Sequence, residues 1–581
     1  MLAVVSTSAM SRTRVSQRTA QGRAFLRLTE RPYGDRPTEA ETSALRRRFL
    51  AVRVHFDAFR LKPIHYVQAI AWRLRGLRLR SRNRFAELMG QSPHAYALWI
   101  ARREPAARMG FFPPPQAELP EVVSVIDCSQ GGEDLLDTLQ SLGGNAGRVI
   151  VVGGQRGGAF ERVEHPRELA ELIDPEGAWL CILRAGDRLA ACALRIYAHA
   201  AWQSPERSLF YADDDLIGPR GERHLPHFKP AWNPELFAHH DFITHASLQK
   251  VSREALRRSQ PRDWVERLVR DAVSSGDLPA HVPMVLHHRK SRPSSILPAY
   301  PKTSIMEEAP SVTAIVPTRN QHSLLRNCVE GLSRTDYPNL EILIVDNGSD
   351  EEETIGYLRA LEQQGIRVLG SPGPFNYSAL NNAAVREIRS DYLCFLNNDV
   401  EMLDSTWLEP LVVHAMQSDI GAVGGRLLYP DRTVQHAGVF IGVGGGAGHA
   451  HRFQRIEDQG YFDRANLPQR VSAVTGACLV VAREKFLAVG GFDETDFPVA
   501  FNDVDLCLKL NSRGWQSFYE PGATLIHHES KSRGNDRAKA NRKRFEGELA
   551  ALKRKWATDC ERDPYHHPNL SPFCEQFVIA V

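Results

Sequence analysis

The stretch VTAIVPTRNQHSLLRNCVEGLSRTDYPNLEILIVDNGS, residues 312–349, decides the fold of the second half of the chain. Its apolar run 312–316 predicts a strand, the apolar spacing within 324–332 predicts a helix, and the apolar run 341–345 predicts a second strand. A strand, a helix and a strand in this order imply neighbouring parallel strands. We therefore expect an α/β fold for this half of the chain.

Polar residues follow three predicted strands where each strand ends. Pro317–Asn320 follows the first strand, Asp346–Ser349 the second, and Asn397–Asp399 the apolar run 393–396. The ligand crevice of an open parallel sheet lies outside the carboxyl ends of its strands, so the three clusters should converge there. Asp346 is placed to bind a ribose or a base, and Asp399 to hold a divalent cation against a diphosphate. Alternatively, Asp346 forms only a turn and Asp399 only caps a helix.

These clusters and several later motifs resemble the family 2 glycosyltransferases with the GT-A fold. The matching segments are 317–320, 345–349, 396–399, 475–478, 489–494, 501–506 and 526–529. Residues 563–571, Asp-Pro-Tyr-His-His-Pro-Asn-Leu-Ser, resemble the tail of tandem-domain, rhamnosyltransferase-like bacterial enzymes of O-antigen synthesis. The resemblance implies a Rossmann-like, nucleotide-sugar-binding catalytic domain over residues 308–535.

The resemblance also implies roles for individual residues. Asp399 would hold Mg²⁺ or Mn²⁺ together with His527, since asparagine occupies the first acid position, and His528 is the alternative to His527. Asp503 would be the general base that takes the proton from the acceptor hydroxyl in a single displacement with inversion. Asp505, two residues further along the same helix, would point in another direction. The nucleotide-binding residues implied are Pro317, Thr318, Asn320, Asp346, Asn381 and Asn398.

Residues 119–300 look like a degenerate second copy of the same domain. Each unit begins with a strand, a polar turn and a helix, and each ends with a strand that runs into paired histidines, His287-His288 and His527-His528. We expect Asp263 at the position of the base and His288 at that of the closing histidine.

The donor site of this first unit is expected to be lost. Gly153 would replace the nucleotide acid and Gly186 the metal aspartate, with Asp187 one residue late, and Arg184 would repel a cation. The acidic run Asp213-Asp214-Asp215 keeps open the alternative of a second active transferase.

The two ends of the chain differ in composition from the two α/β units. Residues 1–118 predict a basic, mostly helical region, and its segment 72–84 carries six arginines among apolar residues. This segment suits a surface that rests on anionic lipid or an acidic glycan carrier, or a solvated face whose arginine stems cover a neighbouring domain. Pro113–Pro115 predicts a linker, and residues 536–581 predict a C-terminal helix and tail.

A glycine-rich segment could be mistaken for a cofactor site. Residues 442–447 fit the dinucleotide fingerprint GxGxxA, but they lie deep inside the unit with no helix pattern after them. We expect a loop near the acceptor, with His449 and His451 facing solvent or substrate.

Bulk composition narrows the class of protein. A length of 581 residues predicts three or four units, and a net charge of +3 is too small to indicate nucleic acid as a partner. The nine cysteines form no CxxC pair, which argues against a disulfide framework or a structural zinc site. No apolar run approaches the ~18 residues of a membrane span, so we expect a cytoplasmic protein or one lying on the inner face of the cell membrane.

The leading hypothesis is an inverting glycosyltransferase. It would move a sugar from a nucleotide-sugar donor to a glycan or a lipid-linked oligosaccharide acceptor during synthesis of a bacterial surface polysaccharide. The alternatives are a non-catalytic glycan-binding scaffold, a bifunctional transferase with both units active, and a nucleotidyltransferase. A scaffold would not need an acid, metal and base set, and a nucleotidyltransferase would need a basic, glycine-rich first turn.

Overall fold

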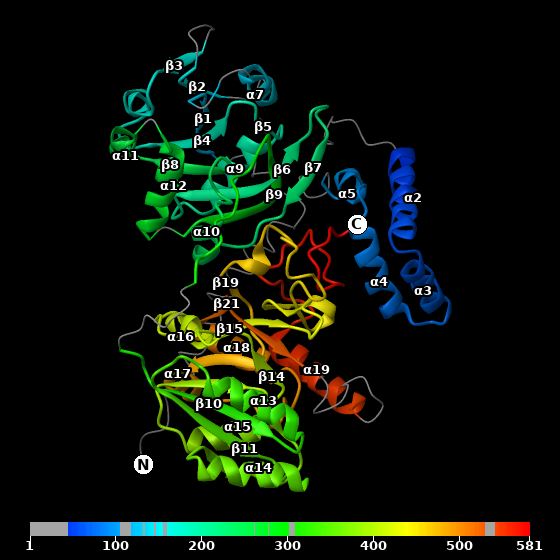
Figure 1. The fold of residues 1–581 in the computed structure, drawn as a ribbon. Helices are drawn as coiled ribbons and strands as arrows, with labels where there is room; N and C mark the ends of the chain where they lie inside the picture. Colours follow the sequence, from blue (N-terminus) through cyan, green and yellow to red (C-terminus); the bar gives the residue numbers. More distant parts are fainter. Residues whose placement is uncertain are drawn as a thin grey trace, which may run out of the picture.

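The computed structural model describes residues 44–104, 118–129, 131, 134–143, 147–154, 160–260, 262–276, 278–300, 308–528 and 541–581. The predicted linker at Pro113–Pro115 and Glu529 of the last motif lie outside these residues. Figure 1 shows two sheet-containing units, with the N-terminal helices and the C-terminal tail beside their junction.

The first unit is built on one mixed sheet. In spatial order its strands are β3 (Glu161–Val163), β2 (Val149–Val152), β1 (Val122–Asp127), β4 (Ala178–Arg184), β8 (Ser247–Val251), β6 (Leu209–Ile217), β9 (Ala280–Arg289) and β5 (Arg188–Leu189), with β7 (Arg223–His227) on β6. The α-helices of this unit are α7 (Leu135–Leu142), α8 (Leu169–Leu172), α9 (Ala193–Gln203), α10 (Pro234–His239), α11 (Arg253–Arg258) and α12 (Trp264–Ser274).

The second unit repeats this plan. Its strands are β12 (Arg367–Gly370), β11 (Leu340–Asp346), β10 (Val312–Thr318), β13 (Tyr392–Leu396), β20 (Cys478–Ala482), β15 (Ile420–Leu428), β21 (Gln516–His527) and β14 (Val400–Met402), with β16 (Val434–His436) on β15 and β19 (Gln469–Val471) on β21. Its α-helices are α13 (His322–Ser333), α14 (Glu352–Gln363), α15 (Tyr377–Arg386), α16 (Leu408–Ala415), α17 (Arg483–Ala488) and α18 (Asn502–Ser512).

The two sheets agree strand by strand. β1 pairs with β2 and β4 in parallel, as β10 does with β11 and β13. The next strand is antiparallel in each unit, β8 against β4 and β20 against β13. This agreement confirms the predicted α/β fold with two tandem copies.

The sheets are mixed, however, and the strand–helix–strand pattern did not predict their antiparallel half. The chain between β15 and β20 forms short strands and turns in place of an α-helix. β20 runs antiparallel to both of its neighbours, β15 and β13.

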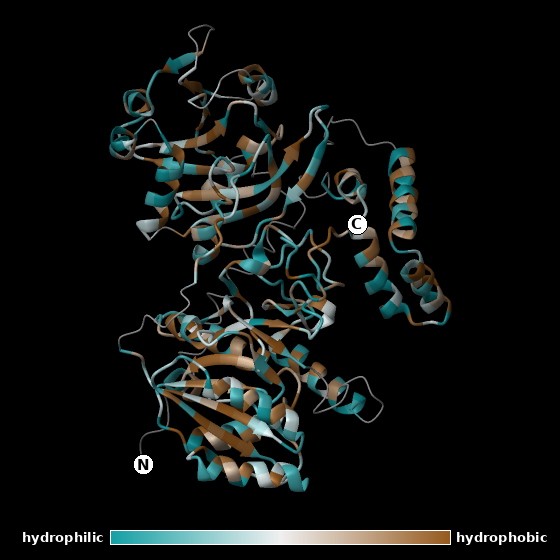
Figure 2. Cartoon of the chain, viewed as in Figure 1, coloured by the Kyte–Doolittle hydropathy of each residue, from teal (hydrophilic) through white to brown (hydrophobic). Residues whose placement is uncertain are grey.

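Both faces of the second sheet are covered. Along β10, Ala314 and Val316 pack with α13, α14 and α16 on one face, whereas Ile315 packs with α15, α17 and α18 on the other. Successive strand residues point to opposite faces, so a strand buried on both sides is apolar throughout. Figure 2 shows these strands as the most hydrophobic part of the unit.

The ends of the chain pack beside the junction of the two units. The N-terminal region forms α2 (Ala44–Leu61), α3 (Pro63–Leu74), α4 (Arg78–Gly90) and α5 (Ala95–Arg102), which confirms its helical prediction. The tail that follows α19 (Arg542–Trp556) runs between these helices and the two sheets (Figure 1). Gln91 Nε2 donates to Gln576 Oε1 of this tail at 2.8 Å. No helix in the described part of the chain is long and apolar enough to cross a membrane.

Helix α19 is fastened to the second unit through a buried carboxylate. Asp505 of α18 is fully buried, accepts a hydrogen bond from Trp556 Nε1 at 2.8 Å, and pairs with Lys555 at 2.8 Å and Lys509 at 3.2 Å. Asp505 therefore points into the protein, as its spacing from Asp503 predicted.

Replacing Asp505 with alanine should lower the free energy of unfolding by about 3–5 kcal/mol, because two cations lose a buried counter-charge. The matched control is Asp496→Ala, whose side chain is 43 % exposed and lies 3.4 Å from Arg554. The control should cost less than about 1 kcal/mol. Urea unfolding followed by tryptophan fluorescence compares the two, and equal losses would contradict this account of α19.

Candidate functional site

The carboxyl ends of β10 and β11 meet at one edge of the second sheet. Thr318 and Asp346, the last residues of the two strands, are partners in the parallel ladder. The hydroxyl oxygen of Thr318 accepts a hydrogen bond from Asn398 Nδ2 at 3.0 Å, and Pro317 is buried beside it. The structure thus brings together polar residues from three separate strand ends.

Two predicted nucleotide-binding residues also shape the neighbouring turns. Asp346 Oδ1 accepts hydrogen bonds from the backbone N–H and the hydroxyl of Ser349, at 3.0 and 2.5 Å. Asn320, with a φ of 56°, accepts bonds from the N–H groups of Asp350 and Glu351 at 2.9 and 3.2 Å. Asp346 does form the turn that was its structural alternative, yet its half-buried carboxylate still lies at the edge.

Asn381 lies on helix α15 and not at a strand end. Its side chain on α15 is fully buried, and its Nδ2 donates to the carbonyl oxygen of Tyr377 one turn earlier at 2.8 Å. In this geometry Asn381 helps to pack the helix.

Asp399 and His527 face each other at the end of a two-stranded ladder. β14 pairs antiparallel with β21, and the register places Val400, the residue after Asp399, opposite His527. Nε2 of His527 lies 3.1 Å from Asp399 Oδ1. The side chains are 11 % and 2 % exposed. His528 points elsewhere, with its Nε2 3.1 Å from Glu401 Oε2.

A glutamine fixes the proton on the His527 ring. Nδ1 of His527 lies 2.7 Å from Gln435 Oε1, and an amide oxygen can only accept. Nδ1 therefore carries the proton, which leaves the lone pair of Nε2 directed at the Asp399 carboxylate. Nothing in the sequence marks Gln435, since it lies on the separate strand β16.

Asp503 lies in the first turn of α18. Its Oδ2 accepts a hydrogen bond from Gly476 N at 2.9 Å, and its Oδ1 accepts one from Val504 N at 2.8 Å. The hydroxyl of Tyr377 donates to the carbonyl oxygen of Gly476 at 2.8 Å. The loop around Gly476 therefore holds the Asp503 carboxylate.

The same loop connects Asp503 to the Asn397–Asp399 turn. The carbonyl oxygen of Ala477, next to Gly476, accepts a hydrogen bond from Asn397 N at 3.1 Å. Asn397 Nδ2 in turn lies 3.3 Å from His527 Nε2. A continuous series of contacts thus joins the Asp503 carboxylate to the Asp399–His527 pair.

The first unit differs at the position of the base. Helices α12 and α18 both follow a residue in the left-handed conformation, Asp263 with φ 54° and Phe501 with φ 60°. Asp263 therefore corresponds to Phe501, and the buried Val265 corresponds to Asp503. The prediction that Asp263 stands at the base position is wrong, because sequence spacing alone does not show which residue precedes the first turn.

The predicted loss of the metal aspartate is also wrong. The alignment of Gly186 with Asp399 assumed that this strand ends at Leu183. Strand β4 includes Arg184 as well, so the turn before β5 is Ala185–Asp187. Arg188 pairs with His288 as Val400 pairs with His527, which gives Asp187 the place of Asp399. Burial raises the pKa of Asp187, and its Oδ1 accepts a hydrogen bond from Lys290 N at 2.8 Å. Neither Val152 nor Gly153, at the end of β2, offers an acid like Asp346.

The acidic run of the first unit is buried among cations. Asp214 is fully buried and pairs with Lys229 at 2.7 Å and Arg292 at 2.5 Å. Burial would raise the pKa of Asp214, but these cations outweigh it and hold the pKa well below its usual range. Asp215 pairs with Arg223 at 2.6 Å and accepts a hydrogen bond from the Tyr96 hydroxyl of α5 at 2.5 Å.

The tail completes this buried cluster. Asp213 lies between two imidazoles, with its Oδ1 2.8 Å from His281 Nε2 and its Oδ2 2.9 Å from His567 Nε2. His567 belongs to the tail, and its ring stacks on Phe228 with the ring centres 5.1 Å apart. The three acids thus hold together the N-terminal helices, the first sheet and the tail.

The glycine-rich segment forms a hairpin and not a cofactor loop. β17 (Val439–Ile441) and β18 (Ala447–His449) pair across it, joined by a short 3-10 turn. His451 is buried and its ring stacks on Phe577, so the expectation that it faces solvent or substrate is wrong. Burial lowers its pKa to about 3.

The second unit is thus an α/β domain with polar residues gathered at the carboxyl ends of its parallel strands. Residues 313–484, within the second unit, match the model of glycosyl transferase family 2. The match confirms the resemblance that the motifs predicted.

Two relatives of the chain are longer than the chain itself. It is 36 % identical over 452 residues to the uncharacterized protein y4gI of Sinorhizobium fredii, covering 70 % of this chain and 50 % of the relative. It is 34 % identical over 442 residues to the O-antigen biosynthesis protein RfbC of Myxococcus xanthus, covering 68 % of this chain and 34 % of the relative. The chain therefore spans half or less of these two proteins.

A shorter relative and a solved structure also align. The chain is 26 % identical over 261 residues to an N-acetylglucosaminyl-diphospho-decaprenol L-rhamnosyltransferase of Mycobacterium tuberculosis, covering 40 % of this chain and 80 % of the relative. A mannosyltransferase of Pyrobaculum calidifontis in complex with GDP-Man and Mn²⁺ aligns over 45 % of this chain and 68 % of its own, with 19 % identity and a TM-score of 0.34. An overlap this low supports no argument about function.

Replacing Gln435 with leucine should lower the free energy of unfolding by about 1–3 kcal/mol, because the buried Nδ1–H of His527 loses its acceptor. The control is Gln417→Leu, since Gln417 is only half-buried and bonds to His414 of its own segment. Urea unfolding measures both variants. A Gln435 variant as stable as the control would show that this hydrogen bond does not fix the ring.

Proposed function

We propose that the protein is a metal-dependent, inverting glycosyltransferase. It transfers a sugar from a nucleotide-sugar donor to a glycan or lipid-linked oligosaccharide in the synthesis of a bacterial surface polysaccharide. The observation that carries the proposal is the contact series from Asp503 through Gly476 and Asn397 to the Asp399–His527 pair.

Donor binding is assigned to the strand-end cluster of the second unit. The Asp346 carboxylate accepts hydrogen bonds from the hydroxyls of the ribose or from donor groups of the base. Thr318 and Asn398 line the edge beside it. Pro317 and Asn320 set the course of the turn, and Asn381 supports the site through α15. The open carboxyl edge of a sheet is where α/β folds hold such ligands.

A divalent cation, Mg²⁺ or Mn²⁺, fits the Asp399–His527 pair. The pair offers a carboxylate oxygen and an imidazole nitrogen whose lone pairs face each other, a donor set that Mn²⁺ accepts. When bound, such a cation neutralises charge on the diphosphate leaving group. The geometry favours His527 over His528, since only the former faces Asp399.

Asp503 is the proposed general base. Its carboxylate is half-buried and is oriented by Gly476 N and Val504 N. In one displacement the acceptor oxygen attacks the anomeric carbon, its proton passes to Asp503, and the bond to the diphosphate breaks. No covalent intermediate with the protein is required, so the configuration at the anomeric carbon inverts.

The first unit is proposed to brace the catalytic unit. Val265 replaces the base, and the β2 strand end lacks the nucleotide acid. Asp214 and Asp215 are paired with cations, and Asp213 lies between two imidazoles. We take the unit as residues 119–300, the catalytic unit as 308–535, and the flanking parts as 1–118 and 536–581. The bifunctional alternative rests on Asp187 and His288, which keep the places of Asp399 and His527.

The acceptor is proposed from the relatives. RfbC of M. xanthus is named for O-antigen biosynthesis, and the M. tuberculosis relative is named for rhamnosyl transfer to a lipid diphosphate. A protein that builds such polymers works in the cytoplasm or on the inner face of the cell membrane.

The donor can be found by screening nucleotide sugars for Mn²⁺-dependent thermal stabilisation. Binding at 100 times the dissociation constant adds about 2.7 kcal/mol to the stability. His527→Ala should lose this stabilisation and His528→Ala should keep it. Stabilisation that persists in excess chelator would remove the metal from the proposal.

With the donor in hand, Asp503→Asn should bind it normally but transfer sugar roughly 10²–10⁴ times more slowly, because an amide cannot take the proton. Initial rates of nucleoside diphosphate release measure the effect. Asp505→Asn is not a suitable control, since that residue anchors α19, and we use Asp496→Asn on the surface. Near-normal turnover by the Asp503 variant would remove it from the mechanism.

One nucleotide sugar should bind per chain, in the second unit. Calorimetric titration should give a stoichiometry near one, because only the second unit combines Asp346 with the Asp399–His527 pair. The Asp346→Ala, Asp399→Ala double variant should lose binding, whereas Asp187→Asn should retain it. A stoichiometry near two, or loss of one of two sites in the Asp187 variant, would establish a bifunctional enzyme.

A further inference from the structure

The outer face of α2 is apolar along its whole length. Leu45, Phe49, Val52, Phe56 and Phe59 recur every three or four residues and are 45–78 % exposed. The residues that α2 buries, such as Leu50 and Val54, lie on the opposite side of the helix. An exposed stripe of this size marks an interaction surface.

Helix α3 extends the apolar surface. Ile64, Val67 and Leu74 are 80, 55 and 83 % exposed, and Ala69 is the residue of α3 that is buried among those described. The two adjoining helices α2 and α3 thus leave large apolar side chains 45–83 % exposed in the part of the chain that the structure describes.

The charge of the same region identifies the partner. Residues 44–84 contain twelve lysines and arginines and one acid, Asp57. Asp57 is already engaged, since it lies 2.7 Å from Ser92 Oγ and 2.7 Å from His94 Nδ1. Apolar stripes flanked by arginines are typical of helices that lie in the interface of an anionic membrane, and a neutral protein partner would leave the cations uncompensated.

A cavity at the base of these helices adds a site for an anionic group. It has a volume of about 1120 Å³ and lies between α2, α4, the end of α5 and the tail. Arg73, Arg78, Arg82 and Arg103 line it, and none of them pairs with an acid among the residues that the structure describes. Burial and the neighbouring Arg102 lower the pKa of Arg103.

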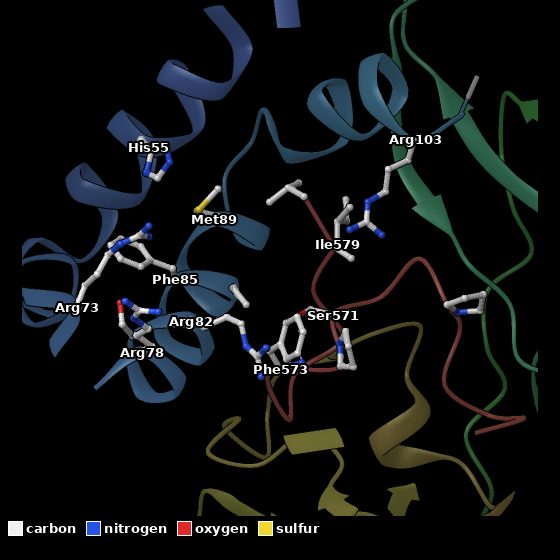
Figure 3. A pocket seen from close by; sticks show the side chains of 16 residues that line it. His55, Arg73, Arg78, Arg82, Phe85, Met89, Arg103, Ser571, Phe573 and Ile579 are labelled. Carbon is white, nitrogen blue, oxygen red and sulfur yellow. Dashed lines mark hydrogen bonds between the residues drawn. The ribbon is translucent and has the colours of Figure 1, made fainter. Parts of the chain in front are cut away.

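The rest of the cavity wall is apolar. Figure 3 shows Arg82 reaching toward Phe573 of the tail, with Arg73 and Arg78 beside Phe85 and Ile579 near Arg103. The guanidinium of Arg82 lies 3.9 Å from the centre of the Phe573 ring. Arginines that surround apolar walls suit a phosphate group attached to a hydrocarbon body.

We propose that α2–α4 and the tail form a binding site for an anionic phospholipid bilayer. The apolar stripe enters the headgroup region, and the arginines of the cavity hold a lipid phosphate. This surface would bring the protein to a membrane without a spanning helix among the residues that the structure describes. The inference does not depend on sugar transfer, so its failure would leave the proposed transferase intact.

Sedimentation with lipid vesicles tests the site. The full-length protein should bind vesicles of phosphatidylcholine mixed with phosphatidylglycerol and should not bind vesicles of phosphatidylcholine alone. Arg73→Gln, Arg78→Gln, Arg82→Gln together should weaken binding roughly 100-fold, the effect of three arginines at about 1 kcal/mol each. Phe49→Ser with Phe56→Ser should also release the protein.

A matched control removes three exposed arginines elsewhere. Arg262, Arg267 and Arg270 lie at the start of and along α12 of the first unit, and their change to glutamine should leave vesicle binding unaltered. An equal loss of vesicle binding in this control would show that binding depends only on net charge, and it would overturn the proposed site. Circular dichroism of each variant confirms that the helices are retained.

The same protein variants also test two other occupants of the site. Calorimetric binding of inorganic phosphate in the cavity, without binding to anionic vesicles, would show a site for a soluble anion and overturn the membrane assignment. Light scattering that shows a dimer, converted to a monomer by the phenylalanine changes with no vesicle binding, would make the stripe a contact between copies of the chain.

Discussion

The loop Thr475–Cys478 has to lie between α18 and the Asn397–Asp399 turn, and the site depends on this placement. Gly476 donates to the Asp503 carboxylate, and Ala477 accepts from Asn397 on the other side. A side chain at 476 would meet the Tyr377 hydroxyl at 3.3 Å and Asp503 Cβ at 3.5 Å, so there is little room for one. This loop therefore fixes the positions of the start of α18, the Asn397–Asp399 turn and His527 relative to one another, although they are far apart in sequence.

The first unit has the same sheet as the second unit but different residues at several of the corresponding site positions. Its sheet keeps the strand order, and Asp187 and His288 keep the positions of Asp399 and His527. A buried valine stands at the position of Asp503, however, and Asp214 and Asp215 of β6 are paired with Lys229, Arg292 and Arg223. Carboxylates taken out of water in this way are stable only while they remain paired, which suits a structural support. The tail joins this cluster through His567, so the brace is continuous with the end of the catalytic unit.

Local patterns predicted the elements of the fold and the strand-end positions of Thr318 and Asp346, but they did not predict the long-range register. The runs 312–316 and 341–345 are β10 and β11, because a strand buried on both faces must be apolar at every position. The antiparallel course of β20 depends on how residues 429–477 cross the sheet, which no local pattern shows. The position of Asp187 depends on one extra residue in β4. Asp263 itself takes the left-handed conformation before α12, which removes it from the first turn. The position of Gln435 depends on the pairing of β16 with β15. Each of these features is set by partners distant in sequence.

The central claim is that the second unit performs one displacement at the anomeric carbon, with Asp503 as base and nucleoside diphosphate as leaving group. Proton NMR of the reaction mixture, followed from the first turnover with the cognate donor, tests it most directly. The account predicts that the new glycosidic bond has the opposite anomeric configuration to the donor, with one nucleoside diphosphate released per sugar transferred. A product that retains the donor configuration, or the release of pyrophosphate, would contradict it.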